Sequence, residues 1–288
     1  MCIVVTYCEY YAHRFPKKFV QIVHPLSTIF VVGTIVFFFW MQMFLIAPQV
    51  YNDFGYKLLW IVVIFIMHNI LGNWIACYRT NSSVEILPKE SQVPVPEKEH
   101  LWRFCDTCNK LMPPRSWHCA LCNCCILRRD HHCIFMATCI GLNNQRYFIW
   151  FAFYSTFALI LSFATFVIYF ARVGCSTLLS PDIFVILLLN CICGVQRDRS
   201  KESLFQTTVF LFNIVVLLIP GSMLAYQIQI LWRNSCYYKI NDSAYDLGFL
   251  KNCKLILGQR GLWTFLSPFL KSPLPHDGTK WEMMPQSN

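Results

Sequence analysis

The chain contains four long apolar runs, and each is long enough to cross a lipid bilayer as a helix. They cover residues 19–47, 58–77, 147–171 and 204–232. A hydrocarbon core of about 30 Å is crossed by about 20 helical residues. Only 14% of the 288 residues are charged, whereas a soluble domain usually carries about 25%. These features exclude a disordered chain, disfavour an ordinary cytosolic globule and predict an all-α integral membrane protein with four transmembrane helices.

The apolar runs divide the sequence into five predicted segments. These are an N-terminus (1–18), transmembrane helices 1 and 2 (19–77), a Cys/His-rich domain (78–146), transmembrane helices 3 and 4 (147–232) and a C-terminal tail (233–288). One further apolar stretch, 183–195, has only 13 residues, which is short for a span. We interpret it as an interfacial or re-entrant segment. If it crossed the membrane, the tail would change sides.

The distribution of Lys and Arg predicts the orientation. Nineteen of the 24 lie in 1–18, 78–146 and 233–288, and five lie in the segments on the other side. Because the side rich in Lys and Arg faces the cytosol, we expect both termini and the Cys/His-rich domain to be cytosolic. The net charge of +9 then fits basic residues at span ends that meet anionic lipid headgroups. Membrane lipid is thus an expected partner, and nucleic acid is not.

Cysteine and histidine are concentrated between the second and third spans. Eight of the 16 cysteines lie in the 35 residues from Cys105 to Cys139. On the cytosolic side thiols stay reduced, so a disulfide framework is disfavoured. Two CxxC-type pairs with nearby histidines are a strong zinc signal, because zinc takes four sulfur or nitrogen ligands in a tetrahedron. A domain of this size is too small for a full core, so bound metal would supply folding energy.

The cluster contains more potential metal ligands than two zinc sites need. Two closed sites need eight ligands, and the cluster offers eight Cys and three His, so three candidates have another role. An inert buried thiol is the ordinary role of a leftover cysteine, and we assign it to Cys124. Cys133 differs, because Asp130 and His131 stand just before it.

The tetrad Asp130-His131-His132-Cys133, within this cysteine spacing, resembles the DHHC family of protein S-acyltransferases (palmitoyltransferases). The order of four spans, with the cluster between the second and third, is similar as well. The other motifs that carry the resemblance are Cys105-x2-Cys108, Pro114-x3-His118-Cys119, Cys122-x2-Cys125, Cys139-Ile140-Gly141-x-Asn143 and, in the tail, Tyr245-x2-Gly248-x3-Asn252. Tyr245-Asp246-Leu247-Gly248 and Ser272-Pro273-Leu274-Pro275 also resemble the vertebrate branch counted as its twenty-fourth member.

The resemblance implies a role for each residue. It implies one zinc ion on Cys105, Cys108, His118 and Cys125, and a second on Cys119, Cys122, His132 and Cys139. It makes Cys133 the nucleophile, with His131 and Asp130 as its catalytic partners. It also implies a protein S-palmitoyltransferase with palmitoyl-CoA as co-substrate, in the endoplasmic reticulum or Golgi membrane. The expected protein substrates carry cytosolic cysteines close to the membrane.

The chemistry of these residues supports the same hypothesis. A free cysteine is mostly protonated at neutral pH, and a histidine within reach can take its proton. An aspartate can fix the tautomer of that histidine. The bilayer would take the acyl chain. The phosphates of CoA need cations on the cytosolic face, and we name Arg115, Arg128 and Arg129 as candidates.

The sequence departs from the family pattern at two places. Ile134-Phe135-Met136-Ala137-Thr138 replaces Pro-Trp-Val-Asn-Asn, and Asn234-Ser235-Cys236-Tyr237 stands where the family has Thr-Thr-x-Glu. A catalytically weak or inactive zinc-domain adaptor therefore stays open as the alternative. A RING-like ubiquitin ligase would leave Asp130, His131 and Cys133 unexplained. A transporter would need charged residues within its spans, and these spans have almost none.

Overall fold

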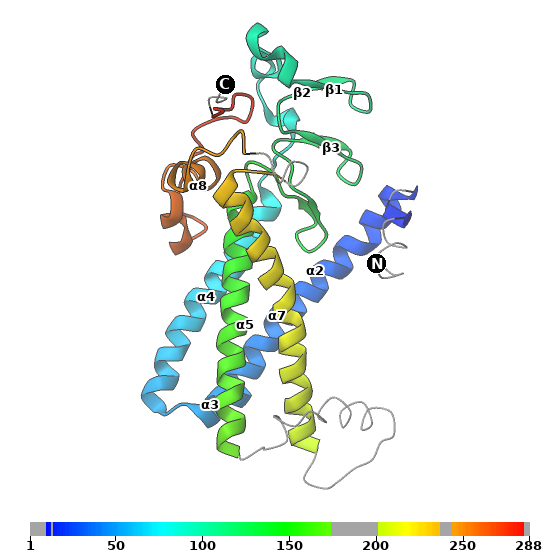
Figure 1. Ribbon diagram of the computed structural model, residues 1–288. Coiled ribbons are helices and arrows are strands. Elements are labelled where there is room, and N and C mark those ends of the chain that lie inside the picture. The colour runs from blue at the N-terminus through cyan, green and yellow to red at the C-terminus, as the bar shows by residue number, and fades with distance from the viewer. Residues whose placement is uncertain (1–9, 13, 174–200, 237–242, 285–288) are drawn as a thin grey trace. The chain divides into compact units, whose positions relative to one another are not determined.

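The computed structural model describes residues 10–12, 14–173, 201–236 and 243–284 (Figure 1). The apolar stretch at 183–195 lies outside these residues, so its relation to the membrane stays a prediction. Within the described chain, long apolar helices and three small hairpins account for most of the regular structure.

Four long apolar helices confirm the predicted class, an integral membrane protein with four candidate spans. They are α2 (Pro16–Trp40), α4 (Asp53–Arg79), α5 (Gln145–Val173) and α7 (Lys201–Arg233). The first span continues through a π-helical turn (Met41–Ile46) and α3 (Ala47–Val50). The helices run past the apolar runs, and several of their end residues suit the helix dipole. Asp53 lies in the first turn of α4, and arginines lie in the last turns of α4, α5 and α7.

Between α4 and α5 the chain forms three antiparallel hairpins. The strands are β1 (Arg103–Cys105) with β2 (Lys110–Met112), β3 (Trp117–Cys119) with β4 (Cys124–Ile126), and β5 (His132–Cys133) with β6 (Thr138–Cys139). Each hairpin turn contains one residue with positive φ, namely Asn109, Asn123 or Ala137. Asparagine tolerates this left-handed conformation better than alanine does, so the third turn is the least well matched to its sequence.

Short helices surround the hairpins and form part of the tail. They are the 3-10 helices η2 (Val84–Ile86), η3 (Lys89–Gln92), η4 (Pro96–Leu101) and η7 (Gly261–Leu266), and the α-helix α8 (Phe249–Leu257). The tail contributes to the core beneath the hairpins, where Tyr245 and Trp281 pack with Leu127 and Leu142. Residues more than 100 positions apart therefore share one core.

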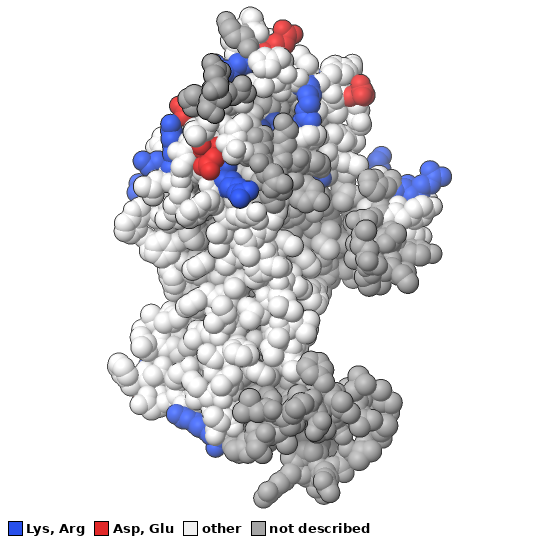
Figure 2. Space-filling model, viewed as in Figure 1, with Lys and Arg blue, Asp and Glu red and all other residues white. Residues whose placement is uncertain are grey.

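The chain divides into two compact units. The strand-bearing unit comprises residues 1–33, 68–151 and 225–288, and the helical unit comprises 34–67 and 152–224. An aromatic cluster that includes Phe166 and Phe210 forms the core of the helical unit. In the same unit Asn213 donates to Ser162 Oγ at 3.0 Å, a polar contact typical of packed membrane helices. On the face shown in Figure 2, charged side chains gather mainly over the hairpins and the tail, and most of the surface over the long helices is uncharged.

Candidate active site and metal sites

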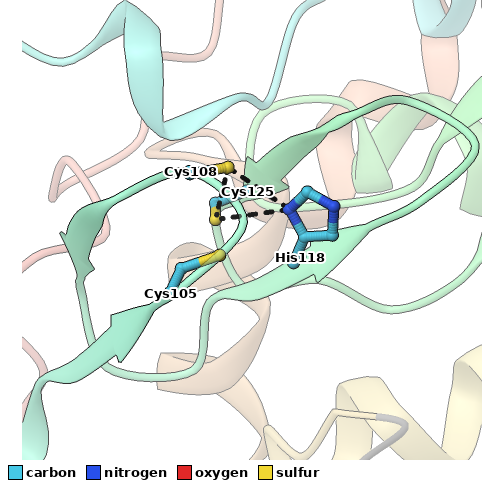
Figure 3. Close-up of side chains that lie close together, drawn as sticks. All are labelled: Cys105, Cys108, His118 and Cys125. Carbon is cyan, nitrogen blue, oxygen red and sulfur yellow. Dashed lines mark hydrogen bonds between the residues drawn. The ribbon is translucent and has the colours of Figure 1, made fainter.

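The first Cys₃His group joins the first two hairpins (Figure 3). It consists of Cys105, Cys108, His118 and Cys125, whose ligand atoms all lie within 4.8 Å of one another. Nδ1 of His118 lies 3.3 Å from Cys108 Sγ and 3.9 Å from Cys125 Sγ, and the two sulfur atoms are 3.5 Å apart. Tetrahedral zinc, with bonds of about 2.3 Å to sulfur and about 2.0 Å to nitrogen, places its ligand atoms about 3.5–3.8 Å apart. The spacing therefore fits a zinc ion.

The second Cys₃His group joins the second and third hairpins. It consists of Cys119, Cys122, His132 and Cys139. Nδ1 of His132 lies 3.6, 3.3 and 3.6 Å from the sulfur atoms of Cys119, Cys122 and Cys139. These distances fit the same tetrahedral arrangement. The structure thus brings all eight predicted ligands together as two groups able to hold metal ions.

Strand geometry explains how one hairpin serves both groups. His118 and Cys119 are consecutive on β3, and consecutive side chains of a strand point to opposite faces. One therefore faces the first group and the other the second. Cross-strand pairing completes the arrangement, because His118 lies opposite Cys125 and His132 lies opposite Cys139. Cys124 is paired with Cys119 across the strands but belongs to neither group.

The predicted catalytic residues lie at the start of the third hairpin. Nδ1 of His131 lies 3.0 Å from Oδ2 of Asp130, and Nδ1 is the donor because a carboxylate only accepts. Cys133 is the second residue of β5, and its side chain is buried in a cluster with Met136 and Phe148. Strand alternation directs Cys133 away from the face of its neighbour His132, which belongs to the second Cys₃His group.

Burial and the polar neighbours have opposite effects on the pKa values of Asp130 and His131. Burial opposes ionisation of Asp130, but the hydrogen bond from His131 and other polar neighbours hold its pKa below the ordinary value. Burial also disfavours a charged His131, but Asp130 and the Cys133 thiol outweigh it and raise the pKa of His131 to about 9. Nε2 of His131 is buried and has no hydrogen-bond partner among the described residues. The raised pKa makes this imidazole a strong base, so it would hold a proton transferred from the Cys133 thiol.

Two residues of α7 hold Asp130, and the sequence did not single them out. Nε2 of Gln227 donates to Asp130 Oδ2 at 2.7 Å, and the Tyr226 hydroxyl donates to Oδ1 at 3.2 Å. Gln145, at the start of α5, donates to Oε1 of Gln227 at 2.9 Å. Both glutamines are fully buried. The signal that could have identified Gln227 is that it is a polar residue within an apolar span.

Asn144 ties the second metal group to the membrane helices. It is fully buried, and its Nδ2 donates to the carbonyl oxygens of Cys139 at 2.8 Å and of Cys77, on α4, at 3.3 Å. Its Oδ1 accepts the backbone N–H of Gly141 at 2.8 Å. A Cβ atom on Gly141 would lie 2.7 Å from the Leu127 carbonyl oxygen, so only glycine fits this approach.

Two of the three arginines predicted to bind CoA are buried. Arg115 is 7% exposed, and its guanidinium lies over the rings of both Tyr245 and Trp281, 4.4 and 4.3 Å from their centroids. It donates to the backbone and side-chain oxygens of Asn234. Arg128 is 1% exposed, and burial lowers its pKa to about 9.

Arg128 donates to acceptors within the chain, and Arg129 is the more accessible of the two. The acceptors of Arg128 are Oε1 of Gln145, Oδ1 of Asn234 at 3.2 Å and the Ser235 carbonyl at 2.9 Å. Arg129 is partly exposed. Of the three predicted arginines, Arg129 is therefore the one accessible to an incoming phosphate, and its role stays a prediction.

A comparison with protein families decides the assignment. Residues 98–242, half of the chain, match the family described as DHHC palmitoyltransferase. The chain belongs to the DHHC palmitoyltransferase family. The matched region contains all eight predicted metal ligands and the Asp130–Cys133 tetrad.

Individual relatives agree with this assignment. The chain is 31% identical over 195 residues to "Probable palmitoyltransferase ZDHHC24" of Rattus norvegicus, covering 63% of this chain and 64% of the relative. It is 31% identical over 161 residues to "Protein S-acyltransferase 8" of Arabidopsis thaliana, covering 56% of this chain and 36% of the relative. It is 28% identical over 194 residues to "Palmitoyltransferase ERF2" of Kluyveromyces lactis, covering 65% and 50%. The matches thus span less than two thirds of each of these relatives.

Proposed function

We propose that the chain is a protein S-palmitoyltransferase that carries a fatty acyl group from acyl-CoA to cysteine thiols of proteins through a thioester on Cys133. The observation that carries the proposal is the hydrogen-bonded Asp130–His131 pair directly before the buried Cys133. Family membership supports the same reaction.

In the first half-reaction, His131 Nε2 takes the proton of the Cys133 thiol. The Cys133 thiolate attacks the carbonyl carbon of the acyl-CoA thioester, and the bond from that carbon to the CoA sulfur breaks. The CoA thiolate leaves with the electron pair and receives the proton from His131. The result is an acyl-Cys133 thioester and free CoA, in ping-pong fashion.

In the second half-reaction, His131 takes the proton of a cysteine thiol on the protein substrate. The substrate thiolate attacks the acyl carbonyl carbon, Cys133 leaves as a thiolate, and the proton returns from His131 to Cys133. Throughout, Asp130 holds His131 in the tautomer with its proton on Nδ1 and stabilises the imidazolium. The hydrogen bonds from Gln227 and Tyr226 to Asp130 keep that carboxylate in place.

We assign a structural zinc ion to each Cys₃His group. The donor set of three thiolates and one imidazole is typical of closed structural zinc sites. Cys105, Cys108, His118 and Cys125 would hold one ion, and Cys119, Cys122, His132 and Cys139 the other. A zinc ion in each group supplies folding energy to hairpins that have little apolar core of their own.

The remaining partners follow from the chemistry of the acyl donor. Arg129 is the arginine we assign to the CoA phosphates, because it is partly exposed, whereas Arg115 and Arg128 are buried. The bilayer takes the acyl chain at about 0.8 kcal/mol per buried CH₂ group, which favours palmitoyl-CoA over short donors. The placement of Lys and Arg supports a cytosolic site with both termini on the same side. Substrate cysteines would lie near the cytosolic surface of the membrane, and the endoplasmic reticulum or Golgi is the proposed location.

The test is formation of the acyl-enzyme. Purified protein in detergent is incubated with labelled palmitoyl-CoA, and Cys133→Ser and Cys124→Ser are compared with wild type while zinc is counted on each. We expect hydroxylamine-sensitive label on wild type and on Cys124→Ser, and none on Cys133→Ser at unchanged zinc content. Wild-type protein that holds two zinc ions but takes no label would refute catalysis and leave the adaptor alternative.

A further inference from the structure

One helix face of the first span contacts the Cys133 hairpin at two points. Nε2 of His24, on α2, lies 3.0 Å from Nε2 of His132. Three residues later on the same helix, the Ser27 hydroxyl donates to the carbonyl oxygen of Ile134 at 2.6 Å. Residues three apart on a helix share a face. The two contacts reach the residues immediately before and after Cys133.

The geometry of the two imidazoles identifies a hydrogen bond rather than stacking of ring faces. Their planes are nearly parallel, at 19°, and the ring centroids lie 5.1 Å apart. The centroids are thus much farther apart than the 3.0 Å between the nitrogens, so the rings meet edge to edge through these atoms.

The metal group fixes the direction of this hydrogen bond. Nδ1 of His132 faces the three sulfur atoms of its group and is the atom directed at a metal ion. A metal-ligating neutral imidazole carries its proton on the other nitrogen, and it nearly always donates that proton to a neighbouring acceptor. Nε2 of His132 is therefore the donor and Nε2 of His24 the acceptor. Carboxylates and carbonyls usually fill this position, and here a histidine of a membrane helix fills it.

The second contact is equally specific. The Ser27 side chain is buried and also lies 3.0 Å from the His24 carbonyl oxygen of its own helix. The Ile134 carbonyl accepts from it at the start of the turn that links β5 to β6, where Ala137 N–H bonds back to Ile134 O. A hydroxyl here limits movement of the backbone directly after the nucleophile.

We propose that His24 and Ser27 are positioning residues. His24 holds the metal-ligating imidazole of His132, Ser27 holds the Ile134 carbonyl, and together they fix Cys133 between them. The inference rests on the proposed function for the role of Cys133. The two contacts themselves are testable without turnover.

The test of His24 is metal retention. Zinc-loaded full-length protein in detergent is mixed with excess chromogenic chelator, and release of each of the two ions is timed. We expect His24→Phe, which keeps the ring and removes the acceptor, to release one ion about 10–100-fold faster, as is typical when the partner of a ligating histidine is lost. His24→Gln places an oxygen near the same position and should restore slow release. Gln21→Leu, at an exposed position of the same helix, is the control and should match wild type.

The test of Ser27 is the reactivity of Cys133. Alkylation of Cys133 by N-ethylmaleimide is followed by mass spectrometry of its peptide. We expect Ser27→Ala to react at least about threefold faster than wild type with unchanged metal release, and Ser27→Thr to restore the slow rate.

The two readouts separate this inference from the proposed function. If wild type takes no acyl label, the proposed function fails, but faster metal release and alkylation in the variants still establish the positioning role. If wild type is acylated, and His24→Phe and Ser27→Ala keep wild-type metal release, Cys133 reactivity and acylation rate, the positioning role is refuted. Failure of His24→Gln to restore retention would likewise refute the hydrogen bond as the cause.

Discussion

Replacing Gln227 with leucine tests whether a side chain of α7 sets the position of the proposed catalytic carboxylate, Asp130. Leucine keeps a comparable volume but removes the 2.7 Å bond to Asp130 and the 2.9 Å bond from Gln145. A hydrogen bond to a charged group contributes about 1.5–3 kcal/mol, and a buried donor left without its acceptor costs about 1–3 kcal/mol. Since neighbouring effects are not additive, we expect Gln227→Leu to destabilise the protein by about 3 kcal/mol.

The effect of Gln227→Leu on catalysis should be smaller than loss of the carboxylate itself. Asp130 keeps its bonds to His131 and Tyr226, so acyl-enzyme formation should slow about tenfold. Loss of the orienting carboxylate in a comparable triad slows catalysis about 10⁴-fold. The assay is the initial rate of thioester formation on Cys133, measured beside thermal unfolding in the same detergent.

Tyr226→Phe is the matched control for Gln227→Leu. It removes a longer bond, 3.2 Å, to the other carboxylate oxygen, Oδ1, and leaves the oxygen that faces His131 untouched. We expect the rate to fall by less than about threefold, because the lost bond is longer and does not reach the carboxylate oxygen that binds His131. A wild-type melting temperature in Gln227→Leu, or a larger rate loss in Tyr226→Phe, would refute the reasoning.

Four further predictions concern the metal groups, the hairpins and the tail. Cys108→Ser should lower the metal content from two ions to one, whereas Cys124→Ser should keep both; elemental analysis decides. Asn144→Ala removes four hydrogen bonds at a fully buried position and should destabilise the protein by about 3 kcal/mol in thermal unfolding. Ala137→Asn, at φ 52°, should stabilise it by about 0.5–1 kcal/mol, because asparagine tolerates the left-handed region better; no stabilisation would contradict the strain. Burial beside arginines lowers the pKa of His276 to about 4 from 6.5. The folded state then binds fewer protons than the unfolded state between these values, so stability should fall as pH drops from 6.5 to 4. His276→Gln should remove this slope in melts taken across that range, and an unchanged slope would contradict the assignment.

The parts of this molecule that could be predicted are those encoded by local spacing. An apolar run of about 20 residues forms a helix in lipid, because a single segment can pair all of its backbone N–H and C=O groups there only as a helix. The CxxC turns place two thiolates near one metal ion over three residues. Because side chains alternate along a strand, His118 and Cys119 point to opposite faces and belong to different Cys₃His groups. In each case the sequence pattern lies within the same short segment as the structure that it predicts.

The parts that could not be predicted depend on contacts between distant residues. Asp130 and Gln227 are 97 positions apart, and His24 and His132 are 108 apart. Nothing in one sequence pairs them. The burial of Arg115 also depends on a contact between distant residues. An arginine in a polar segment is expected to be exposed, but the tail residue Trp281 packs against Arg115. Positively charged residues near a site are therefore weak predictors of which of them meets a ligand.

The contacts of the Asp130–Phe135 segment indicate what sets the position of the proposed nucleophile, Cys133. Gln227 of α7 holds the Asp130 end, and α2 holds the residues on either side of Cys133. On α4, Trp74 donates to the Phe135 carbonyl at 3.0 Å. Three membrane helices thus form hydrogen bonds with the segment Asp130–Phe135, and the segment shares His132 with the second Cys₃His group. Loss of metal should unfold the hairpins, because they have little apolar core of their own, and should thereby abolish acylation. Loss of any one helix contact should instead change the rate of acylation and leave the other contacts in place.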